Sequence, residues 1–396
     1  MAGSKKRSTK KRVSTGSAQR VARHAGQRVG QAVDLGEVRK RIDVIDDHIL
    51  TAISERAKLA QIVGDSKRSE LAVAANGPVE YYRPEREAEV LRRMVAGNPG
   101  PLRNEEVARL FREIMSACLA QQEPLKIAFL GPEGTFAQQA VLKQFGHSVR
   151  AVPLPLIPDV FYEVQAGHAD FGVVPVENST EGTVNHTVDM FMNSPLKICG
   201  EIELRIHQNL MGKMKGLEHI RRVVSHQQSL AQCRAFLDEY LPTVERIAAS
   251  SNAEAARRAR DEEGTAAIAG TVAAEIYGLS VLVPEIEDRP DNTTRFLVIG
   301  RKLFGPSGKD KTTLLLSAGD TQSPGALHRL LEPFARKGIS LTRIESRPSQ
   351  RRKWDYVFFI DVQGHADEQP LKSVLDQLKK HSSLFRVLGS YPCAVL

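Results

Sequence analysis

The chain has 396 residues, of which 41% are hydrophobic, and its formal net charge is +8. This is enough apolar sequence for two or three domains with buried cores, and no stretch approaches the roughly 18 apolar residues of a membrane-spanning helix. The positive charge is concentrated at one end. Residues 1–33 carry nine Lys or Arg and no acid, and subtracting these from the 55 in the chain leaves 46 basic against 47 acidic residues. We therefore expect neither a membrane protein nor a specific nucleic-acid-binding surface on the folded part.

The basic segment, residues 1–33, is rich in Ser, Thr, Gly and Lys and has no apolar stripe, so a disordered, solvated arm is expected. It lacks the apolar region of a secretory signal, although its composition also fits an organellar transit peptide. The histidines show no metal-ligand spacing, and no CxxC pair is formed by the four cysteines, Cys118, Cys199, Cys233 and Cys393. We expect a reduced, cytoplasmic protein without a metal site or a cofactor.

A long helix is predicted from Leu35, because apolar residues recur every three or four positions as far as Ile62 and no strong break comes before Asn76. Some 38 residues at 1.5 Å each give a length of roughly 57 Å. No small domain covers a helix of that length, so its apolar side is expected to meet a partner chain. Homodimerisation or higher self-association follows from this expectation.

Three cations on the long helix have a spacing that bears on ligand binding. Arg56 and Lys67 are separated by three helical turns, so they share a face about 16 Å apart and their long side chains can close on a small dianion. Arg39 lies about 25 Å from Arg56 and is rotated by roughly 100°, so it can reach the same ligand only from a second copy of the helix. Ordinary solvated charges would give the same pattern.

Two shorter helices are predicted next. Pro84 favours the start of one over 84–96, and Asn104 is expected to cap another over 105–122. The helical part resembles the chorismate mutases that are fused to prephenate dehydratases. The matching stretches are Val38-Arg39-Lys40-Arg41-Ile42-Asp43, Ser54-Glu55-Arg56, Lys67, Tyr82-Arg83-Pro84-Glu85-Arg86-Glu87 and Leu110-Phe111-Arg112-Glu113-Ile114-Met115.

That resemblance implies a mutase site that holds chorismate, a dicarboxylate. The reaction is a concerted rearrangement, so the site needs positioning and charge stabilisation but no nucleophile. Lys67 and Gln122 are expected to be catalytic by donating to the ether oxygen. The implied substrate-binding residues are Arg39 from the second copy, Arg56, Lys67, Arg83, Arg86, Glu87, Cys118 and Gln122. Cys118 stands where some relatives have Ser.

Residues 125–300 alternate short apolar runs with helical stretches, which predicts an α/β domain. The expected strands are 126–130, 149–152, 171–176, 197–205, 222–224, 246–249, 266–269, 281–283 and 296–300. Three stretches stand out: Ile127-Ala128-Phe129-Leu130-Gly131-Pro132-Glu133-Gly134-Thr135-Phe136, the run from Val173 to Thr183, and Thr294-Arg295-Phe296. Together they resemble the signature of prephenate dehydratase. The resemblance implies two α/β lobes, joined at 201–206, with the active site in the cleft between them.

In this reading the catalytic threonine is Thr294, acting as a positioned hydrogen-bond donor just before the strand at 296–300. Arg295 is expected to orient a substrate carboxylate, and the backbone N–H groups of 131–135 to form a second anion site. Further substrate contacts are expected from Thr135, Glu177, Asn178, Ser179, Thr183, His226 and Phe296. Taken one at a time, these residues would also serve as caps, turn residues or core polar groups.

After Gly308, residues 312–396 alternate in the order strand, helix, strand, strand, helix, strand, which is a ferredoxin-like α+β pattern. This region contains two motifs, Pro324-Gly325-Ala326-Leu327 and Glu345-Ser346-Arg347-Pro348. They resemble the two phenylalanine-binding motifs of ACT regulatory domains. The resemblance implies that the ligand residues are Gly325, Ala326, Leu327, Glu345, Ser346, Arg347 and Pro348. A chain that ends near Gly308 is expected to keep its activity and lose inhibition by L-phenylalanine.

The sequence thus predicts a basic tail (1–33), a helical mutase domain (34–123), a dehydratase domain (125–303) and an ACT domain (311–396). The favoured function is a bifunctional enzyme that converts chorismate to prephenate and prephenate to phenylpyruvate, with feedback inhibition by L-phenylalanine. Two alternatives stay open: a non-catalytic amino-acid sensor, and an active dehydratase whose helices serve only dimerisation. Use of arogenate as a further substrate is also left open.

Overall fold

The computed structural model describes residues 34–74, 82–317, 324–349 and 356–395. The expected basic arm, residues 1–33, lies outside the described residues. The chain falls into two compact units that meet at Arg56, so residues 34–56 form the described part of the first and the second begins at Ala57.

The predicted long helix is confirmed as one element, α2 (Leu35–Ala74). Large apolar side chains along it remain exposed in the single chain; Ile42, Ile45 and Ile49 are each at least 50% exposed. Burying such side chains would stabilise an association by about 1.5–3 kcal/mol each. None of the helices that the structure describes is long and apolar enough to cross a membrane.

Two short helices follow, α3 (Pro84–Ala96) and α4 (Asn104–Ala120). Pro84 stands in the first turn of α3 as predicted. The prediction that Asn104 caps α4 is wrong, because Arg103 occupies the cap position and makes no side-chain cap bond. The Asn104 side chain instead accepts a hydrogen bond from Asn98 Nδ2 at 2.8 Å.

The first lobe of the central domain is a six-stranded sheet in the order β2-β1-β3-β11-β5, with β4 paired to β3. The helix α5 (Phe136–Phe145) covers one face, while α6 (Ile157–Ala166) and α7 (Asn185–Asn193) pack on the other. The strands are β1 (Lys126–Leu130), β2 (Arg150–Leu154), β3 (Phe171–Asn178), β4 (Gly182–Thr183), β5 (Lys197–Arg205) and β11 (Thr293–Gly300).

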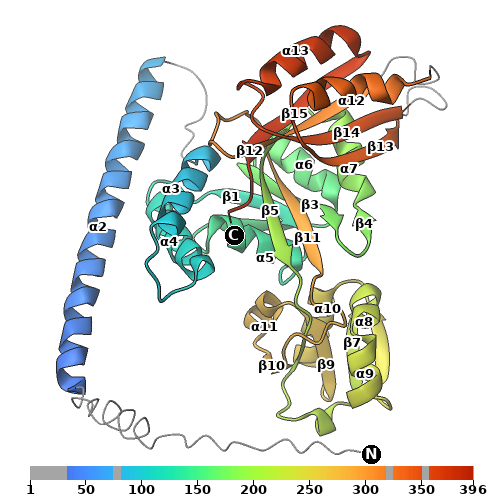
Figure 1. Ribbon diagram of the computed structural model, residues 1–396. Helices are drawn as coiled ribbons and strands as arrows, with labels where there is room; N and C mark the ends of the chain where they lie inside the picture. Colours follow the sequence, from blue (N-terminus) through green and yellow to red (C-terminus); the bar gives the residue numbers. More distant parts are fainter. Residues whose placement is uncertain (1–33, 75–81, 318–323, 350–355, 396) are drawn as a thin grey trace, which may run out of the picture. The chain divides into compact units, whose positions relative to one another are not determined.

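The second lobe is a five-stranded sheet in the order β10-β6-β9-β7-β8, which the chain enters after β5 and leaves before β11 (Figure 1). Its strands are β6 (Asn209–Gly212), β7 (Arg222–His226), β8 (Glu245–Ala249), β9 (Thr265–Ala269) and β10 (Ser280–Val283). Its helices are η1 (Leu217–His219), α8 (Gln227–Gln232), α9 (Arg234–Tyr240), α10 (Asn252–Asp261) and α11 (Thr271–Tyr277). Two sheets joined at the end of β5 give the two-lobed α/β architecture that the sequence predicted.

The C-terminal domain has the predicted βαββαβ order and a four-stranded antiparallel sheet, β13-β14-β12-β15. Its elements are β12 (Asp310–Ser317), α12 (Ala326–Arg336), β13 (Leu341–Pro348), β14 (Tyr356–Gln363), α13 (Leu371–His381) and β15 (Leu384–Pro392). The helices α12 and α13 cover one face of this sheet (Figure 1). The other face shares a hydrophobic cluster with the first lobe, in which Leu315, Phe359 and Leu388 join Leu297 and Ile299.

One boundary differs from the prediction in a way that changes the site. Strand β11 begins at Thr293, three residues before the predicted start. Successive side chains of a strand point to opposite faces of the sheet. Thr294 therefore shares a face with Phe296, which packs in the α5 cluster, whereas Arg295 shares a face with Leu297, which packs toward the C-terminal domain.

Candidate functional site

Thr294 and Asn178 form a polar pair on neighbouring strands of the first sheet. The two residues stand opposite each other in the β11–β3 ladder, and Asn178 Nδ2 donates to Thr294 Oγ1 at 2.8 Å. The Asn178 carbonyl oxygen accepts from the backbone N–H groups of Thr180 and Glu181 at 2.9 and 3.1 Å, which fixes the amide orientation. Within the described chain the Thr294 hydroxyl has no acceptor, so its hydrogen can be donated to a ligand.

A chain of side-chain amides runs from this pair into the second lobe. Asn178 also donates to Asn292 at 3.0 Å, and Asn292 donates to Gln232 at 3.2 Å. Gln208 then bonds both Gln232 and Ser229, at 3.1 and 3.0 Å. Its own oxygen is buried and finds no donor among the described residues. Such a network fixes side chains that lie near Thr294.

Sequence reasoning missed these amides. Asn292 lies two residues before Thr294, and Gln232 lies six residues after His226. Their closeness in sequence to predicted site residues was an available signal. Gln208 carried no such signal, because a lone glutamine between two strands has no distinctive pattern. The predicted site residue His226 stands at the start of α8, and its backbone N–H bonds Asn252 Oδ1 at 3.2 Å.

Three other predicted residues lie around the ends of β1, β3 and β11. Thr135 caps α5, accepts from Gln138 N and donates to the Leu130 carbonyl at 3.1 Å. Ser179 bonds the backbone of Thr293 through both its amide and its hydroxyl. Phe296 is buried in the α5 cluster.

The anion site expected from residues 131–135 has fewer free donors than predicted. The Gly131 N–H bonds the Leu154 carbonyl at 2.8 Å, and the Gly134 N–H bonds Gln138 Oε1 at 2.6 Å. Two of the backbone donors in this turn are therefore already used within the fold.

Arg295 does not face Thr294, which corrects the expectation that it orients a substrate carboxylate. Its guanidinium lies 2.6 Å from Asp361 of the C-terminal domain and 2.9 Å from Glu201 of β5, and it donates to the Tyr391 hydroxyl at 3.1 Å. Burial by itself lowers the pKa of Arg295, but Tyr391, Asp361 and Glu201 outweigh it and raise that pKa. All three nitrogens of the guanidinium are engaged by these partners, so the structure gives no support to a role in orienting a substrate carboxylate.

Glu177 and Thr183 also face the C-terminal domain, against the expectation that they contact substrate. Glu177 lies 3.2 Å from Arg343 Nε. Thr183 accepts from Arg343 at 3.0 Å and donates to Glu345 at 2.9 Å. A β-bulge between β3 and β11 at this level, where the register shifts, accompanies the turning of Glu177 away from the α5 face.

The residues predicted for the mutase site are distributed over both compact units. Arg39 and Arg56 belong to the first, and the second contains Lys67 on α2, Arg83, Arg86 and Glu87 on or beside α3, Cys118 on α4, and Gln122. Arg83 and Arg86 are exposed, and the Gln122 amide donates to the Ala60 carbonyl.

Glu87 and Arg112 form a buried pair between α3 and α4, with 3.4 Å between Glu87 Oε1 and Arg112 Nε. Burial raises the pKa of Glu87, and Arg112 partly offsets that rise. The neighbouring Tyr82 has its pKa raised by burial and by the Glu87 charge. Cys118 is buried on α4.

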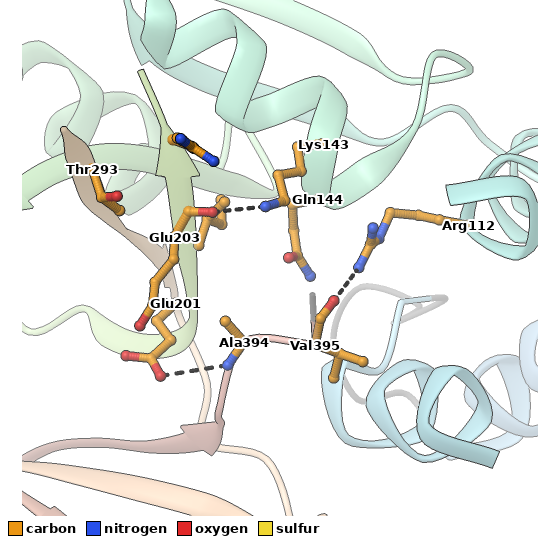
Figure 2. A pocket seen from close by; sticks show the side chains of 10 residues that line it. Arg112, Lys143, Gln144, Glu201, Glu203, Thr293, Ala394 and Val395 are labelled. Carbon is orange, nitrogen blue, oxygen red and sulfur yellow. Dashed lines mark hydrogen bonds between the residues drawn. The ribbon is translucent and has the colours of Figure 1, made fainter. Parts of the chain in front are cut away.

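A cavity of about 370 Å³ lies where α4, α5, β5 and the C-terminal residues meet (Figure 2). Figure 2 shows Arg112 donating to the Val395 carbonyl at 3.3 Å, and Lys143 donating to the Glu203 carbonyl at 2.7 Å. Burial and then the Arg112 charge lower the pKa of Lys143. Thr293, not Thr294, lines this cavity, so it lies apart from the Thr294–Asn178 pair.

The motifs predicted to bind phenylalanine lie at the start of α12 and along β13. Gly325 has a left-handed backbone with a φ of 75° at the cap of α12, a conformation that favours glycine. Along β13, Glu345 and Arg347 turn toward the central domain, and Arg347 pairs with Asp189 at 2.9 Å. The alternate residues Ser346 and Pro348 are exposed, as is Leu327 after the glycine.

Comparison with known proteins adds to this geometry. Family models match residues 127–303 as prephenate dehydratase, 38–123 as chorismate mutase type II and 312–380 as an ACT domain. A bifunctional chorismate mutase/prephenate dehydratase of Stutzerimonas stutzeri is 54% identical over 369 residues, which cover 93% of this chain and all of that protein. The chain belongs to the family of bifunctional chorismate mutase/prephenate dehydratases.

Other relatives agree with this assignment. The bifunctional chorismate mutase/prephenate dehydratase of Pseudomonas aeruginosa is 55% identical over 363 residues, which cover 91% of this chain and 98% of that protein. A crystal structure of the prephenate dehydratase of Arthrobacter aurescens in complex with L-Phe superimposes with a TM-score of 0.62 at 36% identity, over 68% of this chain and 90% of that one. As a member of this family, the chain has chorismate mutase and prephenate dehydratase activities.

Proposed function

We propose that this bifunctional enzyme performs two successive steps of phenylalanine biosynthesis, chorismate to prephenate and prephenate to phenylpyruvate, and that L-phenylalanine inhibits it through the ACT domain. The observation that supports the dehydratase assignment most directly is the Thr294–Asn178 hydrogen bond of 2.8 Å, which leaves the Thr294 hydrogen available. The lack of a metal-ligand pattern in the sequence is in keeping with chemistry that needs no cofactor.

The dehydratase step is carried by Thr294 as catalytic residue. In prephenate the bond between the ring and its carboxylate breaks, and its electron pair enters the ring as CO₂ leaves. The bond between the ring and its hydroxyl group breaks as those electrons shift, and the departing hydroxyl takes one proton from solvent to become water. Thr294 hydrogen-bonds this departing oxygen, which stabilises the charge that develops there. Aromatisation supplies the driving force.

Asn178 orients Thr294, and Asn292 extends the orienting network. The remaining substrate contacts are proposed for Thr135, Ser179 and His226, which lie at the ends of β1, β3 and β7. Phe296 is 2% exposed and packs in the α5 cluster, so it is not assigned to substrate. Glu177, Thr183 and Arg295 are not assigned to substrate, because their side chains bond the ACT domain and β5.

The mutase step is proposed to use a site shared between two copies of α2. Arg56 and Lys67 of one copy and Arg39 of the other bind the two carboxylates of chorismate, while Lys67 and Gln122 stabilise the ether oxygen. Support for a shared site comes from the exposed apolar stripe of α2, which a homodimer or larger homo-oligomer would bury. Arg56→Ala is expected to abolish mutase activity and leave dehydratase activity intact, and unchanged chorismate turnover would refute this role.

Regulation is proposed to act at the two ACT motifs, Gly325–Leu327 and Glu345–Pro348. Support comes from the match to an ACT domain and from the related dehydratase of Arthrobacter aurescens, whose structure is a complex with L-Phe. The four cysteines form no CxxC pair in the sequence, which supports a reduced, cytoplasmic setting.

The proposal is tested by giving purified enzyme chorismate and following prephenate and phenylpyruvate together. Thr294→Ala is expected to consume chorismate at the normal rate while prephenate accumulates. Near-normal phenylpyruvate formation by this variant would remove Thr294 from the mechanism. If the wild-type chain bound L-phenylalanine but turned over neither substrate, the alternative of an amino-acid sensor would replace the enzyme assignment.

A further inference from the structure

Two ion pairs tie the dehydratase sheet to the ACT sheet, and together they form what we term the interdomain clamp: Arg295 with Asp361, and Glu177 with Arg343. The Arg295–Asp361 distance is 2.6 Å, and the Glu177–Arg343 distance is 3.2 Å. Three of the four side chains are at most 13% exposed, and Glu177 is 40% exposed. The Arg295–Asp361 charges have little contact with water, so salt screens them only weakly.

The four clamp residues are register partners in pairs. Arg295 stands opposite Glu177 in the β11–β3 ladder, and Arg343 stands opposite Asp361 in the β13–β14 ladder. Each sheet therefore presents one cation and one anion side by side, and the charges of one sheet match those of the other. This complementarity fixes the alignment of β3 and β11 against β13 and β14.

The dehydratase half of the clamp adjoins the catalytic pair in sequence. Arg295 follows Thr294 directly, and Glu177 precedes Asn178 directly. Thr294 and Asn178 are themselves ladder partners and share the 2.8 Å hydrogen bond. Each clamp residue is joined by one peptide bond to a member of this pair. A shift of Arg295 therefore moves the Thr294 hydroxyl, and a shift of Glu177 moves the Asn178 amide that orients it.

The ACT half of the clamp adjoins the proposed phenylalanine motif. Arg343 precedes Glu345 by two residues on the same face of β13, and Thr183 bridges these two side chains. Further along β13, Arg347 bonds Asp189 and Asn185 of α7. The face of β13 that carries Arg343, Glu345 and Arg347 is thus bound to the dehydratase lobe over its whole length.

We propose that Arg295 and Glu177 are positioning residues of the dehydratase site, and that the interdomain clamp transmits phenylalanine binding on β13 to the Thr294–Asn178 pair. This inference rests on the proposed inhibition by L-phenylalanine. The clamp is a pair of discrete ion pairs that L-phenylalanine can strengthen or loosen, and coupling free energies between sites commonly change affinity 5- to 150-fold. The mutase site is not part of this route.

The test uses the full chain with two substitutions on the ACT side, Asp361→Asn and Arg343→Gln. Each is measured for dehydratase kcat and KM, for L-phenylalanine binding by calorimetry, and for the L-phenylalanine concentration that halves dehydratase activity. We expect calorimetric binding to remain and the half-inhibitory concentration to rise about tenfold or more. Retained calorimetric binding of L-phenylalanine reports that the ACT domain is folded, and mutase activity reports that the helical module is folded. Glu332→Gln, which removes an exposed ion pair with Arg336 on α12, is the matched control and should leave inhibition unchanged.

A charge exchange separates positioning from substrate binding. Arg343→Glu alone should weaken inhibition. Arg343→Glu combined with Glu177→Arg should restore part of it, since the ion pair is re-formed with reversed polarity but stands beside the like charges of Arg295 and Asp361. If Glu177 contacted prephenate, the double variant would instead show a raised KM and no rescue. Inhibition of Asp361→Asn and Arg343→Gln at wild-type concentrations of L-phenylalanine would overturn the clamp alone. A wild-type enzyme that L-phenylalanine did not inhibit would overturn the proposed regulation together with it.

Discussion

Replacing Asn178 by Asp tests how the threonine hydroxyl is aimed. In the native enzyme the Asn178 amide donates to Thr294 Oγ1 at 2.8 Å, so the hydroxyl hydrogen must point elsewhere. Aspartate has nearly the same shape and keeps an oxygen for the N–H groups of Thr180 and Glu181, which Asn178 Oδ1 accepts at 2.9 and 3.1 Å. It has no N–H to donate, so the threonine hydroxyl is expected to turn and donate to the new carboxylate.

The size of the effect follows from that new bond. A hydrogen bond to a charged acceptor contributes about 1.5–3 kcal/mol, and it must be broken before Thr294 can donate to the departing oxygen of prephenate. Each 1.36 kcal/mol added to the barrier lowers the rate tenfold. We therefore expect the dehydratase kcat to fall about 10- to 150-fold.

The assay follows phenylpyruvate formation from saturating prephenate and, separately, chorismate consumption as an internal control. The mutase rate should be unchanged, because Asn178 belongs to the first α/β lobe. Asn193→Asp, an exposed position at the end of α7, adds the same charge and should leave both rates unaltered. A dehydratase kcat within twofold of wild type in Asn178→Asp would show that the hydroxyl is not aimed by this amide.

Three further predictions concern the ACT domain and the thiols. Tyr391→Phe loses the 2.8 Å bond with Thr313 and the 3.1 Å bond from Arg295, and should lower the free energy of unfolding by about 1–3 kcal/mol in urea titrations. Burial raises the pKa of Tyr391 in the folded protein. The stability that its neutral phenol contributes is therefore present below the unfolded pKa near 10 and is lost as pH rises through the folded pKa. Above pH 10, Tyr391→Phe should lose less stability than the wild-type protein does. A chain that ends at Gly308 should keep dehydratase activity and lose inhibition, but melt at a lower temperature, because the shared hydrophobic cluster is uncovered. Burial raises the pKa of both Cys233 and Cys393, so a thiol reagent at pH 8 should label half-buried Cys393 slowly and leave Cys233 unlabelled until the protein unfolds.

Each of these predictions has a result that contradicts it. Parallel stability curves for wild type and Tyr391→Phe above pH 10 would mean that the phenol titrates alike in both states. A truncated chain with the wild-type melting temperature would show that the ACT sheet adds nothing to the first lobe. Equal labelling of both cysteines in the native protein would contradict their burial.

Much of the fold was predictable because the relevant signals are local. The three- and four-residue spacing of α2, the proline at the start of α3, and the βαββαβ order of the ACT domain all follow from neighbouring residues. One error was also local in origin. Asn104 was expected to cap α4, but its amide oxygen bonds Asn98, a partner that helix patterns do not reveal.

The sequence by itself determined the three modules, their order and the stretch that carries Thr294, the proposed catalytic residue, since motif spacing and apolar periodicity are properties of the chain. Only the tertiary structure decided which neighbours of Thr294 share its face of the sheet. Strand β11 starts at Thr293, so Thr294 and Arg295 point to opposite faces. Arg295 then meets Asp361, 66 residues along the chain, because the ACT sheet packs on that face. Long-range pairing of charges depends on how sheets pack together, and no local pattern in a sequence specifies it.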